Sequence, residues 1–254
     1  MDKELKLRIL GTHNYESRDT RYVSFLIDDI LALDAGSITR ALTFSEQEKI
    51  RAILLSHGHF DHIRDIDSLA LPSKNAGLTI NVIGIPETIQ LVKSTLPKIY
   101  LEPNPLLPTY VLEEKNPYET FSVLNYGVTI LPVNHSIPAS GFQISDEKIK
   151  LFYTGDTGSQ LSHLWNHISP NVLLTEVTFG NENIDKARSV GHLTPFLLGE
   201  VLEEFESVHG YFPRVIATHF NPFWERTIRQ ELQQLSEKLG IEIIISIADQ
   251  IIDL

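Results

Sequence analysis

The sequence predicts an α/β protein with four layers, an α/β/β/α sandwich, in one domain over residues 1–254. Two observations predict this fold class. Short apolar strands followed by helices occur in two successive blocks, which suit two sheets with helices on their outer faces. The length, together with 42% hydrophobic and 21% charged residues, is also ordinary for a globular two-sheet unit.

The first block combines short strands with two helices. Alternating or wholly apolar stretches predict strands over residues 5–10, 22–27, 30–33, 53–55 and 78–84. We expect one helix over 63–71, stopped by Pro72, and a second over 86–93, with Pro86 in its first turn.

The segment 97–117 is rich in proline and separates the two blocks. This composition predicts irregular structure around a single strand at 109–112. The stretch from residue 100 to 126, which overlaps this segment, contains the aromatic residues Tyr100, Tyr110, Tyr118, Phe121 and Tyr126. We interpret them as anchors of a loop; stacking on a nucleobase and a contact in a homodimer are the alternatives.

The second block repeats the order of strands and helices. Strands are predicted over 128–133, 141–144, 149–153, 172–174 and 215–217, and helices over 194–207 and 224–239. Thr194 and Pro195 are typical of a helix cap and first helical residue. Apolar residues at helical spacing in the last helix predict a core-facing side.

Composition limits the chemistry and the partners. The chain has no cysteine, so a metal site here must use histidine and carboxylate ligands. The net charge of -12 makes a long nucleic acid an unfavourable partner, whereas bound metal ions would still attract a small anionic substrate. There is no apolar run near the roughly 20 residues that span a membrane, and no signal peptide, so we expect a cytoplasmic protein without a membrane partner.

The strongest motif is His57-Gly58-His59-Phe60-Asp61-His62, directly after a predicted buried strand. Imidazole nitrogen and carboxylate oxygen are ligands of Zn²⁺, and four of them here lie within six positions. A polar surface loop is the alternative, but three histidines and one aspartate so close together favour a metal site.

Three further residues follow predicted strands, where α/β proteins usually place their sites: His135, Asp156 and His219. Each alone is a weak signal. Together with the motif they supply enough ligands for two ions, with one ion held by His57, His59 and His135, the other by Asp61, His62 and His219, and Asp156 bridging both. Zn²⁺ is the expected metal, with Mn²⁺ or Fe²⁺ as alternatives.

These motifs, in this order, resemble the metallo-β-lactamase superfamily over nearly the whole chain. Leu10-Gly11-Thr12 and Leu33-Asp34-Ala35-Gly36 are also similar to its opening motifs. The resemblance implies the metallo-β-lactamase fold and the ligand roles given above. It also implies that Asp34 orients a metal-bound imidazole, although Asp34 could equally be a turn residue before Gly36.

The stretch around Glu176 and Gly191-His192-Leu193-Thr194-Pro195 is similar to the phosphodiesterase branch, and most to bacterial class II cyclic-nucleotide phosphodiesterases. Phe60 departs from the leucine expected in that group and is expected to change packing only. The resemblance implies a binuclear phosphodiesterase acting on a small phosphodiester, with a 3′,5′-cyclic nucleotide as the expected substrate.

We expect a hydroxide between the ions to attack phosphorus, with Asp61 orienting or deprotonating the water. His192 would protonate the leaving oxygen while Glu176 holds it; a plain neighbour of the helix cap is the alternative for His192. His13 borders the cleft or, more simply, lies in a solvated loop.

Three other functions compete. One is tRNase Z-like RNA processing, which the charge disfavours; the resemblance also implies a long tRNA-binding arm that has no counterpart between His135 and Asp156. The others are a carboxylic-ester, thioester or lactam hydrolase on the same metals, and a sensor without activity, which would need no proton donor.

Overall fold

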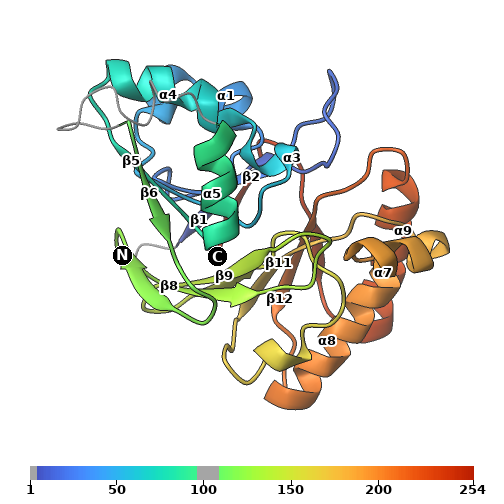
Figure 1. Ribbon diagram of the computed structural model, residues 1–254. Coiled ribbons are helices and arrows are strands. Elements are labelled where there is room, and N and C mark those ends of the chain that lie inside the picture. The colour runs from blue at the N-terminus through green and yellow to red at the C-terminus, as the bar shows by residue number, and fades with distance from the viewer. Residues whose placement is uncertain (1–4, 96–108) are drawn as a thin grey trace. The chain divides into compact units, whose positions relative to one another are not determined.

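The apolar strands of the sequence assemble into two seven-stranded sheets in the computed structural model, which describes residues 5–95 and 109–254 (Figure 1). The first sheet belongs to a unit formed by residues 5–12, 16–95, 109–116 and 247–254, and the second to a unit formed by residues 13–15 and 117–246. The single domain predicted over 1–254 stays a prediction.

The sheet of the first unit has the order β14-β1-β2-β3-β4-β5-β6. Its strands are β1 (Lys6–Gly11), β2 (Ser24–Ile27), β3 (Leu31–Leu33), β4 (Ala52–Leu54), β5 (Ile80–Gly84), β6 (Tyr110–Glu114) and β14 (Ile251–Asp253). Pairing is antiparallel from β14 to β3 and parallel from β3 to β6. The residues of β2, β3 and β4 are all buried, which explains why these short strands read as continuous apolar runs.

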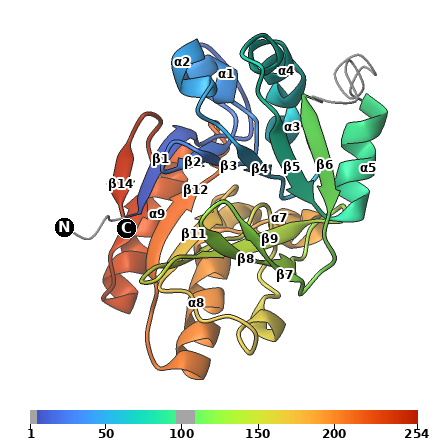
Figure 2. The same cartoon turned by 90° about the vertical axis from the view of Figure 1, so that its left-hand side faces the viewer.

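The helices of this unit are α1 (Ile38–Ala41), α2 (Phe44–Gln47), α3 (Phe60–Ile63), α4 (Asp65–Asn75) and α5 (Pro86–Thr95). Figure 2 shows α1, α2 and α4 together on one side of the sheet. Thr43 and Glu46 form a capping box at the start of α2. A core of buried aliphatic residues, Ile53 and Leu69 among them, joins strands and helices.

The predicted end of a helix at Pro72 is wrong, because α4 continues through Pro72 to Asn75. The proline costs one backbone hydrogen bond, to the carbonyl of Ser68, and Ser68 is exposed to water, which can replace it. The helix then closes one turn later, where the Ala76 N–H donates to the Pro72 carbonyl at 3.0 Å.

The sheet of the second unit has the order β13-β12-β11-β10-β9-β8-β7. Its strands are β7 (Thr120–Val123), β8 (Tyr126–Pro132), β9 (Ser140–Ser145), β10 (Lys150–Tyr153), β11 (Val172–Glu176), β12 (Arg214–Thr218) and β13 (Ile243–Ile245). The strands from β7 to β10 pair antiparallel, and those from β10 to β13 pair parallel. The carboxyl ends of β10, β11 and β12 therefore meet at one edge, which brings distant polar residues together.

The helical elements of this unit are η1 (Ser162–Leu164), η2 (Asn181–Asn183), α7 (Ile184–Val190), α8 (Pro195–His209) and α9 (Glu225–Leu239). The predicted cap of α8 is confirmed, because Thr194 accepts the Leu197 N–H at 3.3 Å and Pro195 is the first helical residue. The predicted core side of α9 is also confirmed: Ile228, Leu232 and Leu235 are buried.

The predictions for the segment 97–117 are tested only in part. The strand expected at 109–112 is confirmed as β6, whereas residues 97–108 and Tyr100 lie outside the described residues. Among residues 5–95 and 109–254, no helix is both long and apolar enough to cross a membrane.

Candidate metal centre

The motif after β4 forms one group of side chains in the first unit, His57, His59, Asp61 and His62, which we call the N-terminal cluster. His57 Nε2 lies 3.0 Å from His59 Nδ1, and His62 Nε2 lies 3.6 Å from the nearer Asp61 oxygen. The rings of His57 and His62 have centroids 4.1 Å apart. Because α3 begins at Phe60, the motif turns from an extended loop into a helix between its second and third ligands.

Asp34 orients two histidines of the N-terminal cluster. Its carboxylate is fully buried and accepts the His62 Nδ1–H at 2.6 Å and the Ser56 hydroxyl at 2.7 Å. The Ser56 oxygen in turn lies 3.0 Å from His57 Nδ1 and can accept its proton. With Nδ1 held in this way, Nε2 is the nitrogen of His57 and of His62 that could serve as a metal ligand. Asp34 has φ 54°, so it is also a turn residue before Gly36. The two interpretations, a turn residue and a residue that orients an imidazole, therefore apply together.

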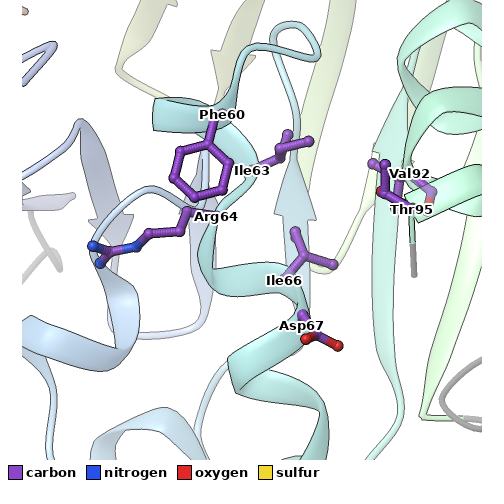
Figure 3. Close-up of a pocket in the computed structure, with 7 residues that line it drawn as sticks. All are labelled: Phe60, Ile63, Arg64, Ile66, Asp67, Val92 and Thr95. Atoms are coloured by element: carbon purple, nitrogen blue, oxygen red, sulfur yellow. Dashed lines mark hydrogen bonds between the residues drawn. The ribbon is translucent and has the colours of Figure 1, made fainter. Parts of the chain in front are cut away.

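Phe60, in the middle of the motif, was expected to change packing only, and its side chain is 64% exposed. It lies edge-to-face with Tyr22, at 6.1 Å between ring centroids, and borders a pocket of about 230 Å³. Figure 3 shows the residues that line this pocket, on α3, α4, α5 and the turn between α3 and α4: Phe60, Ile63, Arg64, Ile66, Asp67, Val92 and Thr95.

The second unit brings together four residues from four segments, His135, Asp156, His192 and His219, which we call the C-terminal cluster. His219 Nε2 lies 3.3 Å from one Asp156 oxygen, while His135 Nε2 and His192 Nδ1 lie 4.0 and 3.9 Å from the other. One potential ligand atom each of Asp156, His192 and His219 lies within 4.8 Å of the others. The strand-end residues predicted from sequence thus converge with His192 inside this unit.

His135 is oriented by the backbone. Its Nδ1–H donates to the Gly191 carbonyl at 2.9 Å, which turns Nε2 toward Asp156. Burial lowers the pKa of His135 and so favours the neutral imidazole, the form that binds metal. Gly191 has φ 70°, and a Cβ there would lie 2.6 Å from the His135 Cα, so this close approach requires glycine.

Glu176, the last residue of β11, holds parts of the C-terminal cluster in place through hydrogen bonds. Its carboxylate is fully buried, and one oxygen accepts the His192 Nδ1–H at 2.6 Å and the Thr157 N–H at 2.9 Å. The other oxygen accepts the N–H groups of Thr178 and Leu193 at 3.1 and 3.2 Å. The contact predicted between Glu176 and His192 is therefore present, and it leaves His192 Nε2 as the nitrogen available for chemistry.

Thr178 is a functional candidate that the sequence interpretation missed. Its hydroxyl donates to Glu176 at 2.7 Å, so its oxygen can accept the His219 Nδ1–H at 2.8 Å. This orients His219 Nε2 toward Asp156. The available signal was a polar residue four positions after the strand predicted over 172–174. Its partner, His219, is 41 positions away, so the local sequence could not reveal the contact.

The donor atoms fit divalent metal ions. Two ligands about 2.1 Å from a tetrahedral Zn²⁺ are about 3.4 Å apart. Spacings of 3.0 and 3.6 Å occur in the N-terminal cluster, and of 3.3 and 4.0 Å in the C-terminal cluster. Each of His57, His62, His135 and His219 has an oxygen partner at Nδ1, as metal-bound histidines almost always do.

The expectation that His13 is solvated is wrong, because only 8% of the residue is exposed. It forms a β-bridge with Phe220 and its Nε2 lies 3.0 Å from a Glu225 oxygen. Burial here comes from partners more than 200 positions away in the chain, so no local pattern could reveal it.

Residues 25–220 match the model of the beta-lactamase superfamily domain. The chain belongs to this superfamily. The expected metallo-β-lactamase fold, an α/β fold with two mixed sheets flanked by helices, is thereby confirmed, and the family supports a metal-dependent hydrolase.

Relatives fit the expected branch of the superfamily. Ribonuclease Z of Methanococcus maripaludis (strain C7) is 31% identical over 155 residues, which cover 57% of this chain and 49% of that protein. The chain thus spans about half the length of this relative. The probable metallo-hydrolase YhfI of Bacillus subtilis is 23% identical over 189 residues, which cover 70% and 71% of the two proteins.

Solved structures share the fold along the whole chain. The metallo-β-lactamase fold protein YhfI from Bacillus subtilis has a TM-score of 0.82 at 20% identity and covers 98% of this chain and 99% of its own. Unliganded yeast PDE1 has a TM-score of 0.83 at 16% identity, covering 99% of both. Human tRNase Z, short form, has a TM-score of 0.70 at 19% identity, covering 97% and 98%.

Proposed function

We propose that this superfamily member is a binuclear metal-dependent phosphodiesterase whose substrate is a small phosphodiester, a 3′,5′-cyclic nucleotide. The pairing of His192 with Glu176, at 2.6 Å and beside Asp156, is the observation that carries the proposal. A departing alkoxide needs a proton, and a histidine fixed through Nδ1 to a buried carboxylate is suited to deliver one from Nε2.

The proposal assigns the two clusters to one centre. His57, His59 and His135 would hold one ion, and Asp61, His62 and His219 the other, with Asp156 shared between them. Zn²⁺ is the proposed metal, and Mn²⁺ or Fe²⁺ suits the same nitrogen and oxygen ligands. Two bound ions would supply Lewis acidity and activate water.

The side chains perform the remaining steps. Asp61 would orient the attacking water or accept its proton, and His192 would protonate the departing 3′ or 5′ oxygen. Glu176 would keep His192 in place, supported by its backbone donors at Thr157 and Leu193. Asp34 and Thr178 would hold the Nδ1 atoms of His62 and His219 so that Nε2 of each faces its ion.

RNA processing is the second candidate. Several curated relatives bear the name ribonuclease Z, and this favours an RNA substrate over a carboxylic ester, a thioester or a lactam. From the net charge of -12 we expected a long nucleic acid to be an unfavourable partner. The relatives named ribonuclease Z do not support this expectation.

A substrate panel on metal-loaded protein tests the proposal. Cyclic nucleotides, bis(p-nitrophenyl) phosphate, precursor tRNA and a thioester would be offered under the same conditions. We expect turnover of a cyclic nucleotide. Cleavage of precursor tRNA alone would select the second candidate, and cleavage of the thioester alone would reject both.

Leaving-group dependence tests the role of His192. We expect His192→Ala to keep its metal but to lose about 10²- to 10⁴-fold in turnover of a cyclic nucleotide, whose leaving group is poor. The loss with a nitrophenyl ester should be much smaller, because nitrophenolate leaves without a proton. His163→Ala, which removes an exposed histidine of the same unit, is the control. Equal losses with both substrates would contradict proton donation.

A further inference from the structure

Two neighbouring aromatic side chains of the second unit are exposed to water. Phe223 is 83% exposed and Tyr15 is 52% exposed. Their rings lie edge-to-face, with centroids 6.0 Å apart and an interplanar angle of 64°. An edge-to-face pair leaves ring faces free to stack on a third ring. We call Tyr15 and Phe223 the aromatic ledge.

The backbone under the ledge is firmly held. Residues 13–15 belong to the second unit although the chain on either side belongs to the first. His13 pairs with Phe220, and the Asn14 N–H donates to the Phe220 carbonyl at 3.3 Å. On the other side of the ledge, the Phe223 N–H donates to the Asn221 side chain at 3.0 Å. The exposed rings therefore stand on a fixed backbone.

A partly buried carboxylate, Glu225, adds to this support through its hydrogen bonds. His13 Nε2 lies 3.0 Å from one oxygen of Glu225, and the other oxygen accepts Arg229 at 2.6 and 2.9 Å. The hydrogen bond from His13, with that from Arg229, lowers the pKa of Glu225 to about 2. Because Glu225 begins α9, these hydrogen bonds fix the start of that helix directly after the ledge.

Aromatic contacts lead from the proposed proton donor to Trp224, the residue that follows the ledge residue Phe223 in the chain. The ring of Phe179 lies 5.7 Å from His192 and 5.3 Å from Trp224, measured between ring centroids. Trp224 follows Phe223 in the chain, and Phe223 is four positions after His219. The ledge is thus joined through short stretches of chain and through Phe179 to the residues that would handle the phosphodiester.

We propose that Tyr15 and Phe223 stack on the base of a nucleotide substrate and so set a preference for nucleotides over other phosphodiesters. This inference rests on the proposed function and adds to it the residues that would contact the base of the substrate. Aromatic rings stack on any base, so the ledge favours the presence of a base more than its identity.

The test compares two phosphate ligands that differ in the base, adenosine 5′-monophosphate and ribose 5-phosphate, by calorimetry on the metal-loaded protein. Neither is a phosphodiester, so the readout does not depend on hydrolysis. We expect adenosine 5′-monophosphate to bind about five- to tenfold tighter, and Phe223→Ala to reduce this ratio to near one. Phe223→Tyr should restore the ratio. Phe44→Ala, which removes a phenylalanine that is 70% exposed on α2, should leave it unchanged.

Equal affinities of the wild-type protein for the two ligands, or an unchanged affinity ratio in Phe223→Ala, would overturn the proposal that the ledge stacks on a base. So would a shift of Phe223→Ala from dimer to monomer with the ratio intact, since the ledge would then be a contact between copies. A protein with the expected ratio that hydrolyses no phosphodiester would instead refute the proposed function and leave the ledge standing.

Discussion

Replacing Thr178 with valine removes one buried hydroxyl and almost nothing else, because the two side chains have nearly the same shape. The hydroxyl joins Glu176 to His219, at 2.7 and 2.8 Å. Glu176 keeps its contacts with His192 and three backbone N–H groups, so the carboxylate remains well satisfied. The main consequence therefore falls on His219, whose Nδ1 loses its acceptor.

The magnitude follows from that lost acceptor. A buried donor without its hydrogen bond costs about 1–3 kcal/mol, and removing the partner of a metal-bound histidine typically costs about 10- to 100-fold in metal affinity. Because His219 is one of the proposed ligands of one ion only, we expect Thr178→Val to weaken binding of one of two ions by this factor and to leave the other nearly unchanged.

Metal titration by calorimetry, with Zn²⁺ added to metal-free protein, measures this directly. Thr178→Ser keeps the hydroxyl and should bind like the wild type. Thr175→Val is the matched control, because Thr175 is equally buried on β11 but its hydroxyl accepts a hydrogen bond from Thr154, at 3.3 Å. We expect Thr175→Val to bind both ions like the wild type. If Thr178→Val does so too, the assignment of His219 as a metal ligand supported by Thr178 is refuted.

Three further predictions concern supports of the two clusters and of the aromatic ledge. Asp34→Asn keeps a residue that tolerates φ 54° but weakens the hold on His62, so metal affinity should fall about 10- to 100-fold while the unfolding temperature changes little. Hydrogen bonding, chiefly from His13, holds the pKa of Glu225 at about 2, below the ordinary 4.5. Glu225→Gln should therefore lower the free energy of unfolding by about 1–2 kcal/mol above pH 4.5. In urea titrations, this difference between the variant and the wild type should vanish as the pH falls toward 2. Gly191→Ala places a Cβ 2.6 Å from the His135 Cα at φ 70°, so denaturant unfolding should show a loss of about 2–3 kcal/mol, and an unchanged midpoint would contradict the close approach.

The sequence was sufficient where the signal was local. The helix caps at Thr194 and Pro195 and the apolar stripe of α9 need only neighbouring residues, and both were predicted correctly. The placement of Asp156 and His219 at strand ends was also predictable, because parallel strands place their carboxyl ends at the same edge of a sheet.

The sequence was insufficient where a residue acts through distant partners. Thr178 is an ordinary strand-end threonine until the fold brings it to His219, 41 positions later. His13 looked solvated because its carboxylate partner is 212 positions away. The strands β13 and β14 were missed; each lies at the edge of its sheet and pairs with one strand that is distant in the chain, β12 for β13 and β1 for β14.

We propose that two metal ions are held by seven side chains: His57, His59, Asp61, His62, His135, Asp156 and His219. Anomalous diffraction at the zinc edge, from crystals of Zn²⁺-loaded protein, tests it most directly. We predict two peaks about 3.5–4 Å apart, one contacted by His57, His59 and His135 and the other by Asp61, His62 and His219, with Asp156 touching both. A single peak held by one cluster alone, or peaks away from these side chains, would contradict the account.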